Sequence, residues 1–222
     1  MTQSKPYTQI RVGAVLLAAG EGSRMGNIPK CLIQLDGLTL LQRQLIALSE
    51  AGVDEVVVVS GHHHLAVERE LAALKSLNPM RVIRNAHANE GQATSVRLGI
   101  ETLGSDFDAV IMALSDQPFI DSHDIKALIA TFKKRTVGEI ILPMFNGQRG
   151  NPIILSGSVI KTILASGAKM VCRNFMDQHP ELVHQWQTQN DHYVVDVDTP
   201  EDLKALSKNT GLIFSLPNSG SL

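Results

Sequence analysis

The sequence predicts an α/β domain in which a doubly wound, mainly parallel sheet lies between two layers of helices. Segments with the spacing of strands and of helices alternate along most of the 222 residues, which is the pattern of this fold class. The first strand candidate, residues 11–18, is almost continuously apolar, as expected for a central strand covered on both faces. In such a sheet, ligands bind beyond the carboxyl ends of the strands. The loop after residue 18 is therefore a candidate site.

The spacing of apolar residues assigns the elements in order. Runs rich in valine, isoleucine and leucine predict strands, while apolar residues three and four positions apart predict helices. We expect strands at 11–18, 55–60, 81–84, 108–114, 139–142, 153–155, 182–186 and 192–197. We expect helices at 41–52, 67–78, 92–103, 122–135, 158–164, 169–178 and 200–206.

These elements fit one domain, since α/β domains often run to about 200–250 residues. We assign residues 11–206 to this domain and residues 1–10 to an N-terminal extension. Asn, Gly, Ser and Pro are scattered through residues 207–222, which we expect to form a flexible tail.

Composition narrows the class of partners. A formal net charge of −2 and an aromatic content of 4% argue against a surface for nucleic acid or for a membrane. No apolar run approaches the roughly 18 residues that span a bilayer. Cys31 and Cys172 lie far apart without metal-ligand spacing, and residues 1–10 lack the apolar core of a signal peptide. We therefore expect a cytoplasmic protein.

The first strand leads into a glycine-rich loop that carries two cations. Gly20, Gly22 and Gly26 permit sharp turns and close approach to a ligand, and unpaired N–H groups in such a loop can face an anion. Arg24 and Lys30 are the cations of this segment. Together these features suggest that the loop binds a polyphosphate.

Two common phosphate-binding loops do not fit this sequence. The dinucleotide fingerprint needs a glycine where Met25 stands, and an acidic residue after the second strand, where Ser60-Gly61-His62 stands. The P-loop needs Gly-Lys followed by Ser or Thr, whereas Lys30 precedes Cys31.

The loop instead resembles the signature of nucleotidyltransferases of the glycosyltransferase-A type. Its string is Leu-Ala-Ala-Gly-x-Gly-Ser-Arg-Met-Gly with a later Pro-Lys. Within that superfamily, residues 12–206 resemble the MobA-like NTP transferases, in particular the molybdenum cofactor cytidylyltransferases. Further motifs carry the likeness: Thr94-Ser95-Val96-Arg97, Ser115-Asp116-Gln117-Pro118, Arg149-Gly150-Asn151-Pro152 and Asp-Val-Asp-Thr-Pro-Glu-Asp at 196–202. The resemblance implies a Rossmann-like, three-layer α/β/α fold of the nucleotide-diphospho-sugar transferase type.

The resemblance also implies transfer of a nucleoside monophosphate onto a phosphorylated acceptor, with release of pyrophosphate. The Leu-Ala-Ala-Gly form favours CTP as the donor. Arg24 and Lys30 would be catalytic, because they would hold the phosphates and stabilise the transition state. The implied nucleotide-binding residues are Leu17, Ala18, Ala19, Gly20, Glu21, Gly22, Ser23, Arg24, Lys30, Asn85, Gly91, Ser95 and Asp116.

Three carboxylates are candidate ligands for Mg²⁺, which prefers oxygen ligands and keeps several waters. Asp116 follows an expected strand and matches the metal aspartate of the family. Asp196 and Asp198 lie two residues apart, so that both would share one face of an extended strand. Either could be the second ligand. Asp116 and Asp198 also precede expected helices, where an aspartate can serve as a helix start.

The resemblance places the acceptor beside Gln117, Arg149, Asn151 and Lys169, and it implies molybdopterin as that acceptor. Onward transfer to a molybdoenzyme or its chaperone is a further implication. Asn151 stands where the family more often has His, and Lys169 where it tends to have Arg. These departures leave the identity of the acceptor open, since lysine offers a point charge and not a planar fork.

Other functions stay open. The same transfer could use a sugar phosphate or a methylerythritol-type phosphate. The scaffold could also serve a nicotinamide-dependent oxidoreductase, or a protein that binds nucleotide or pterin without turnover. The triplet His62-His63-His64 suggests a metal, but three consecutive side chains cannot all face one ion in a regular strand or helix. We expect a polar loop there.

Overall fold

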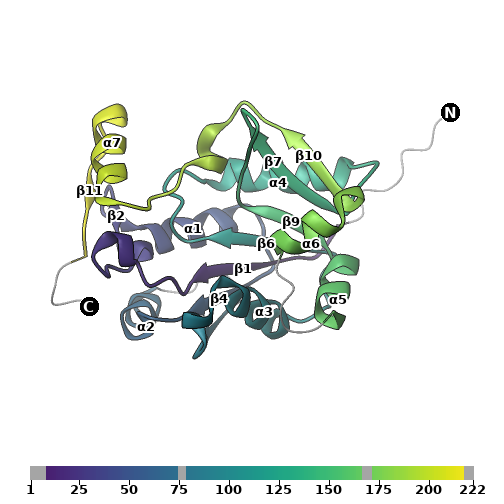
Figure 1. Ribbon diagram of the computed structural model, residues 1–222, viewed down its shortest axis with the longest axis horizontal. Coiled ribbons are helices and arrows are strands. Elements are labelled where there is room, and N and C mark those ends of the chain that lie inside the picture. The colour runs from purple at the N-terminus through teal and green to yellow at the C-terminus, as the bar shows by residue number, and fades with distance from the viewer. Residues whose placement is uncertain (1–8, 75–78, 167–171, 218–222) are drawn as a thin grey trace.

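A mainly parallel sheet of eight strands forms the centre of the molecule (Figure 1). The computed structural model describes residues 9–74, 79–166 and 172–217. The strand order is β10-β7-β9-β6-β1-β4-β5, and β8 pairs with β7 beside this path. These strands are β1 (Val12–Ala18), β4 (Glu55–Ser60), β5 (Met80–Arg84), β6 (Ala109–Leu114), β7 (Ile140–Phe145), β8 (Gln148–Arg149), β9 (Ile153–Ser156) and β10 (Val183–Gln187).

The register of the central strands brings three loops together. β1 pairs in parallel with β4 on one side and with β6 on the other. Ala18 lies beside Ser60, and Leu17 lies beside Leu114, so the three strands end at one edge of the sheet. β9 is antiparallel to both β6 and β7. The loops that follow β1, β4 and β6 therefore meet at the edge where ligands bind in this fold class.

Helices cover both faces of the sheet, which confirms the predicted three-layer α/β/α fold. One face carries α1 (Leu40–Glu50), α2 (His64–Ala73) and α4 (Ser122–Lys134), and the other carries α3 (Gln92–Leu103), α5 (Gly157–Ala165) and α6 (Cys172–Gln178). Within the described residues, no helix is long and apolar enough to cross a membrane.

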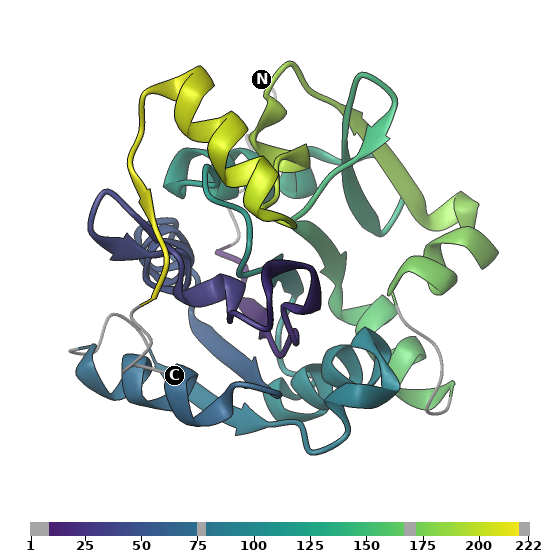
Figure 2. The same ribbon diagram turned by 60° about the vertical axis from the view of Figure 1, so that its left-hand side comes forward.

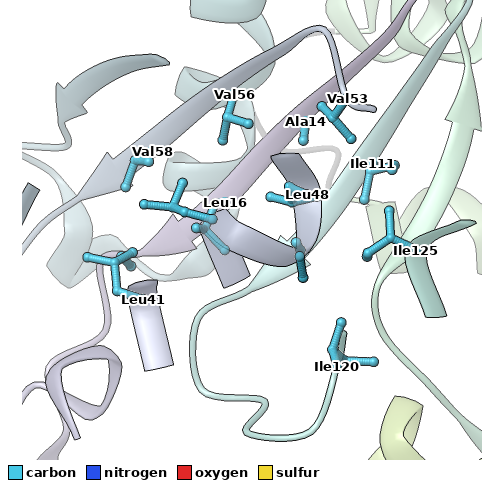
Figure 3. Close-up of a cluster of buried hydrophobic side chains, with 14 of the residues drawn as sticks. Ala14, Leu16, Leu41, Leu48, Val53, Val56, Val58, Ile111, Ile120 and Ile125 are labelled. Atoms are coloured by element: carbon cyan, nitrogen blue, oxygen red, sulfur yellow. The ribbon is translucent and has the colours of Figure 1, made fainter. Parts of the chain in front are cut away.

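Alternate residues of β1 belong to the two apolar layers, because successive side chains of a strand point to opposite faces. Leu16 packs with Leu41 and Leu48 of α1 in the first layer (Figure 3). Its neighbour Val15 packs with Ile100 of α3 in the second layer. Burial on both faces explains why β1 is apolar along its whole length.

A small antiparallel sheet of three strands lies beside the glycine-rich loop (Figure 2), and the sequence did not predict it. Its strands are β2 (Gln34–Leu35), β3 (Leu38–Thr39) and β11 (Phe214–Ser215), with β2 in the middle. The last helix, α7 (Pro200–Thr210), precedes β11. A third apolar cluster joins the loop, this sheet and α7: Met25, Ile33, Leu35, Leu40, Val197 and Leu203.

Two predictions near the C-terminus were wrong. The flexible tail expected from residue 207 begins inside α7, and Phe214–Ser215 then pairs with β2. Pairing between β11 and β2, which lie far apart in the chain, leaves no pattern in the sequence around either strand. The strand expected over 192–197 is a short 3₁₀ helix, Asp191–Val194, followed by a loop. The Asn190 side chain caps this helix by accepting a hydrogen bond from the backbone N–H of His192.

Candidate active site

The glycine-rich loop after β1 turns back sharply at Gly22 and Gly26, whose φ angles are +70° and +72°. Glycine adopts this region without strain. A Cβ at Gly22 would lie 1.9 Å from the carbonyl oxygen of Ile28, so no larger residue fits there. The glycines therefore fold the loop onto itself and bring Arg24 and Lys30 to the carboxyl ends of β1 and β6.

A cavity of about 470 Å³ opens beside this loop. Eleven of the predicted nucleotide-binding residues line it: Leu17, Ala18, Ala19, Gly20, Glu21, Gly22, Ser23, Arg24, Lys30, Ser95 and Asp116. The lining also includes residues that the sequence did not predict to bind the nucleotide: Cys31, His62, Ala88, Asn89, Gln92, Leu114 and Ser115. Except for Cys31, which follows Lys30, these residues lie at or after the carboxyl ends of β4, β5 and β6, and that position was the available signal, since these strand ends meet at one edge.

Lys30 lies between two of the predicted metal carboxylates. Its Nζ is 3.6 Å from Asp116 Oδ2, and it donates a hydrogen bond to Asp198 Oδ1. The other oxygen of Asp198 pairs with Arg24 Nη2 at 2.8 Å. The Lys30 side chain is 18% exposed, whereas that of Arg24 is 64% exposed. The fold thus gathers four charged groups from segments that are far apart in the sequence.

The environment of Asp116 and Asp196 favours the neutral forms of these two carboxyl groups. Burial raises the pKa of Asp116, although the charge of Lys30 opposes that rise. The nearby Asp196 and Asp198 raise the pKa of Asp116 further. Burial and the charge of Asp198 likewise raise the pKa of Asp196. A cation that joined these carboxylates would relieve their repulsion.

The carboxylates fit a divalent cation that would be shared with an anionic ligand. Asp116 Oδ1 is buried without a hydrogen-bond partner among the described residues, as expected for an oxygen left free for a cation. In residues 9–74, 79–166 and 172–217, no group of three His, Cys, Asp or Glu side chains could hold an ion alone. Mg²⁺ is commonly bound by one or two carboxylates together with substrate phosphates. Asp116 and Asp198 could supply these carboxylates.

Asn85 and Gly91 support the cavity without lining it. Asn85 is buried, and its Nδ2 donates to the hydroxyls of Thr94 and Ser95, each at 2.8 Å. Its Oδ1 accepts from the backbone N–H of His87. Gly91, at φ +107°, precedes α3. Both residues therefore shape the β5–α3 connection.

A second cavity of about 520 Å³ shares Leu17, Gln92 and Leu114 with the first. The predicted acceptor residues Arg149 and Asn151 line it. Arg149 Nη1 also pairs with Asp177 of α6 at 2.6 Å. The remaining lining residues are Ala93, Val96, Met112, Leu142, Gln148, Gly150, Ile153, Cys172, Arg173, Asn174 and Met176.

Gln117 lies inside the protein and lines neither of these two cavities. Its Nε2 donates to the carbonyl oxygens of Asn151 and Tyr193, each at 3.0 Å. Its Nε2 therefore links two loops, and its contact with the acceptor stays a prediction. The fourth predicted acceptor residue, Lys169, lies outside the described residues.

Comparison with known proteins decides the family. A family model described as the MobA-like NTP transferase domain matches residues 14–183. The chain belongs to this MobA-like NTP transferase family. The match runs from Ala14, inside β1, to Val183, the first residue of β10, so it includes the glycine-rich loop, Asp116 and Arg149.

Curated relatives of this MobA-like chain carry different chemistries. Nicotine blue oxidoreductase from Paenarthrobacter nicotinovorans is 26% identical over 88% of this chain and 96% of its own length. 2-C-methyl-D-erythritol 4-phosphate cytidylyltransferase from Thermobifida fusca is 34% identical over 54% of this chain and 49% of its own length.

Solved structures share the fold of this MobA-like chain. Rv0371c from Mycobacterium tuberculosis superposes with a TM-score of 0.73 and 23% identity, over 90% of this chain and 100% of the other. A manganese complex of the same protein superposes with a TM-score of 0.69 and 21% identity, with the same coverage. At these identities the likeness shows the architecture alone.

Proposed function

We propose that the protein transfers CMP from CTP to a phosphorylated acceptor, with Mg²⁺ as cofactor and pyrophosphate as the second product. One observation carries this proposal: Lys30 and Arg24 meet Asp116 and Asp198 beside a cavity lined by the glycine-rich loop. Such a set of cations, carboxylates and backbone N–H groups suits a polyphosphate bound with a divalent ion.

The residues act by positioning and by neutralising charge. An oxygen of the acceptor phosphate attacks the α-phosphorus of CTP, and the bond from that phosphorus to the bridging oxygen of pyrophosphate breaks. The partly buried Lys30 lies where it can stabilise charge that develops at the α-phosphate. The exposed Arg24 can leave Asp198 and hold the outer phosphates. Magnesium, when bound with the nucleotide, neutralises further phosphate charge.

No covalent step is needed in this mechanism. Cys31 is the thiol that lines the nucleotide cavity, and burial raises its pKa to about 12. A thiol is a nucleophile only as the thiolate. Cys31 is therefore an unreactive part of the wall at neutral pH.

The second cavity supports the acceptor side of the proposal. Because it shares Leu17, Gln92 and Leu114 with the nucleotide cavity, a ligand there would approach the nucleotide directly. Arg149 supplies a cation for the acceptor phosphate. Apolar side chains such as Met112, Leu142 and Ile153 suit a flat ring system. We propose molybdopterin as the acceptor, in the cytoplasm, with a molybdoenzyme or its chaperone as the next recipient.

A nicotinamide-dependent oxidoreductase is the second candidate, because the relative from Paenarthrobacter nicotinovorans is an oxidoreductase that matches nearly end to end. The end of β4 argues against this candidate. Ser60-Gly61 follows there, and no carboxylate is available for the ribose of a dinucleotide. Oxidation of NADH or NADPH, followed by absorbance, tests it directly.

The decisive assay measures pyrophosphate release with CTP, GTP, ATP and UTP against molybdopterin, sugar phosphates and methylerythritol phosphate. We expect release with CTP and molybdopterin and at least a 100-fold loss in Asp116→Asn, the size of effect typical of a lost charge-stabilising group. Asp106→Asn is the matched control, since Asp106 is exposed and precedes β6, at the end of that strand opposite to Asp116. Indifference to Asp116→Asn, or no release with any pair, would contradict the proposal.

A further inference from the structure

One ring of the histidine triplet contacts the glycine-rich loop. His63 Nε2 lies 2.8 Å from the carbonyl oxygen of Glu21. A carbonyl oxygen only accepts hydrogen bonds, so Nε2 must carry the proton and donate it. Glu21 and Gly22 both line the nucleotide cavity. The contact therefore links the start of α2 to the segment expected to hold phosphates.

Close packing brings the two loops together. A Cβ at Gly61 would lie 2.7 Å from the carbonyl oxygen of Ala19. Only glycine at this position lets the turn after β4 lie against the turn after β1. The His63 side chain makes no capping hydrogen bond to α2, which it precedes. The ring of His63 thus forms its hydrogen bond with the glycine-rich loop and does not cap α2.

The contact fixes the orientation of one peptide group. Because the peptide bond is planar and trans, the N–H of Gly22 points away from the side to which the Glu21 carbonyl points. Glycine tolerates many backbone conformations, so the Glu21–Gly22 peptide would turn over at little cost if its carbonyl had no partner. His63 holds that carbonyl and so keeps the Gly22 N–H directed away from α2.

We propose that His63 is a positioning residue for the nucleotide. Its ring holds the Glu21 carbonyl so that the N–H of Gly22 is presented to the triphosphate. Backbone N–H groups in such turns form concave anion sites. This inference rests on the proposed function, because it requires a nucleoside triphosphate in the cavity.

Four proteins test the inference: the wild type, His63→Ala, His63→Gln and His64→Ala. Calorimetry gives the dissociation constants for CTP with Mg²⁺ and for pyrophosphate. We expect His63→Ala to weaken both by roughly 3- to 10-fold, the worth of one hydrogen bond. His63→Gln keeps an N–H donor and should stay within about twofold of the wild type. His64→Ala is the matched control, because His64 begins α2 without a hydrogen bond to the loop.

Hydrogen–deuterium exchange of the free proteins gives a second readout. Amides of residues 19–24 should exchange faster in His63→Ala, and should exchange as in the wild type in the other two variants. Unchanged binding and exchange in His63→Ala, or equal weakening in His63→Gln, would overturn the inference. If the wild type bound none of CTP, GTP, ATP and UTP, the proposed function would be contradicted. The exchange comparison would then still decide whether His63 holds the loop.

Discussion

At the residue scale, the carboxamide of Gln117 holds two loops together beside the second cavity. The side chain is buried, and its Nε2 bonds to the backbone of Asn151 and Tyr193. Gln44 Nε2 in turn donates to the carbonyl oxygen of Gln117 at 2.8 Å. Gln117 therefore connects the strand end that carries Asp116 to the loop that carries Asn151. Its hydrogen bonds thus hold the segment that lines the first cavity against the loop that lines the second.

Replacing Gln117 with leucine should lower the free energy of unfolding by about 1–3 kcal/mol, since the carbonyl of Asn151 would lose its buried donor. Urea denaturation measures this change. Gln185→Leu, at an exposed position of β10, is the control and should change the free energy by less than about 0.5 kcal/mol. Equal stability of the two variants would show that the carboxamide does not hold the loops.

At the scale of one element, the start of α7 fixes the backbone of Asp198. The Thr199 hydroxyl accepts from the backbone N–H of Asp202, and the Asp202 carboxylate accepts from the N–H groups of Thr199 and Asp198 at 2.7 and 3.0 Å. This capping box satisfies free donors at the helix start. Because Asp198 also pairs with Arg24 and Lys30, the cap of α7 is part of the support of the site.

Asp202→Ala should lower the free energy of unfolding by about 1 kcal/mol, the usual worth of a capping interaction. It should also lower the rate of nucleotidyl transfer, because the Asp198 backbone loses its anchor. Glu201→Ala is the control: Glu201 lies in the same first turn and shares the helix dipole, but it makes no capping bond there. Urea denaturation and pyrophosphate release measure the two effects. Similar rates of nucleotidyl transfer in both variants would show that Asp202 does not support the active site.

At the scale of the whole molecule, each of the two apolar layers contains one cysteine, whose reactivity can be used to follow the unfolding of that layer. Cys31 belongs to the layer of α1, α2 and α4, and Cys172 to the layer of α3, α5 and α6. Burial raises the pKa of each thiol to about 12. A raised pKa keeps the thiol protonated, so only about one in ten thousand would be ionised at pH 8.

Both cysteines should therefore resist iodoacetamide at pH 8 and react quickly in concentrated urea. If residues 11–206 form one cooperative domain, the two thiols should become reactive at the same urea concentration. Mass spectrometry of the labelled peptides measures each site separately. Labelling of one thiol well before the other would divide the chain into two units and contradict the predicted domain organisation.

Much of the fold could be predicted because its signals are local. The expected strand at 55–60 and helix at 92–103 match β4 and α3, since each carries a clear apolar period. β2, β3 and β11 were missed, because two-residue strands have no period and their pairing joins distant segments. Asp196 and Asp198 were both candidate metal ligands, and the structure shows Asp198 in contact with Lys30. The expected strand that would have placed Asp196 beside it is a 3₁₀ helix and a loop.

The sequence by itself determined the α/β class, the family motifs and the cations Arg24 and Lys30 of the glycine-rich loop. These depend on residue type, spacing and steric freedom, which are properties of short segments. Only the tertiary structure decided that Lys30 lies between Asp116 and Asp198, that Gln117 faces the interior, and that His63 contacts Glu21. Such contacts depend on how parallel strands bring their ends together and on which side chains the packing buries.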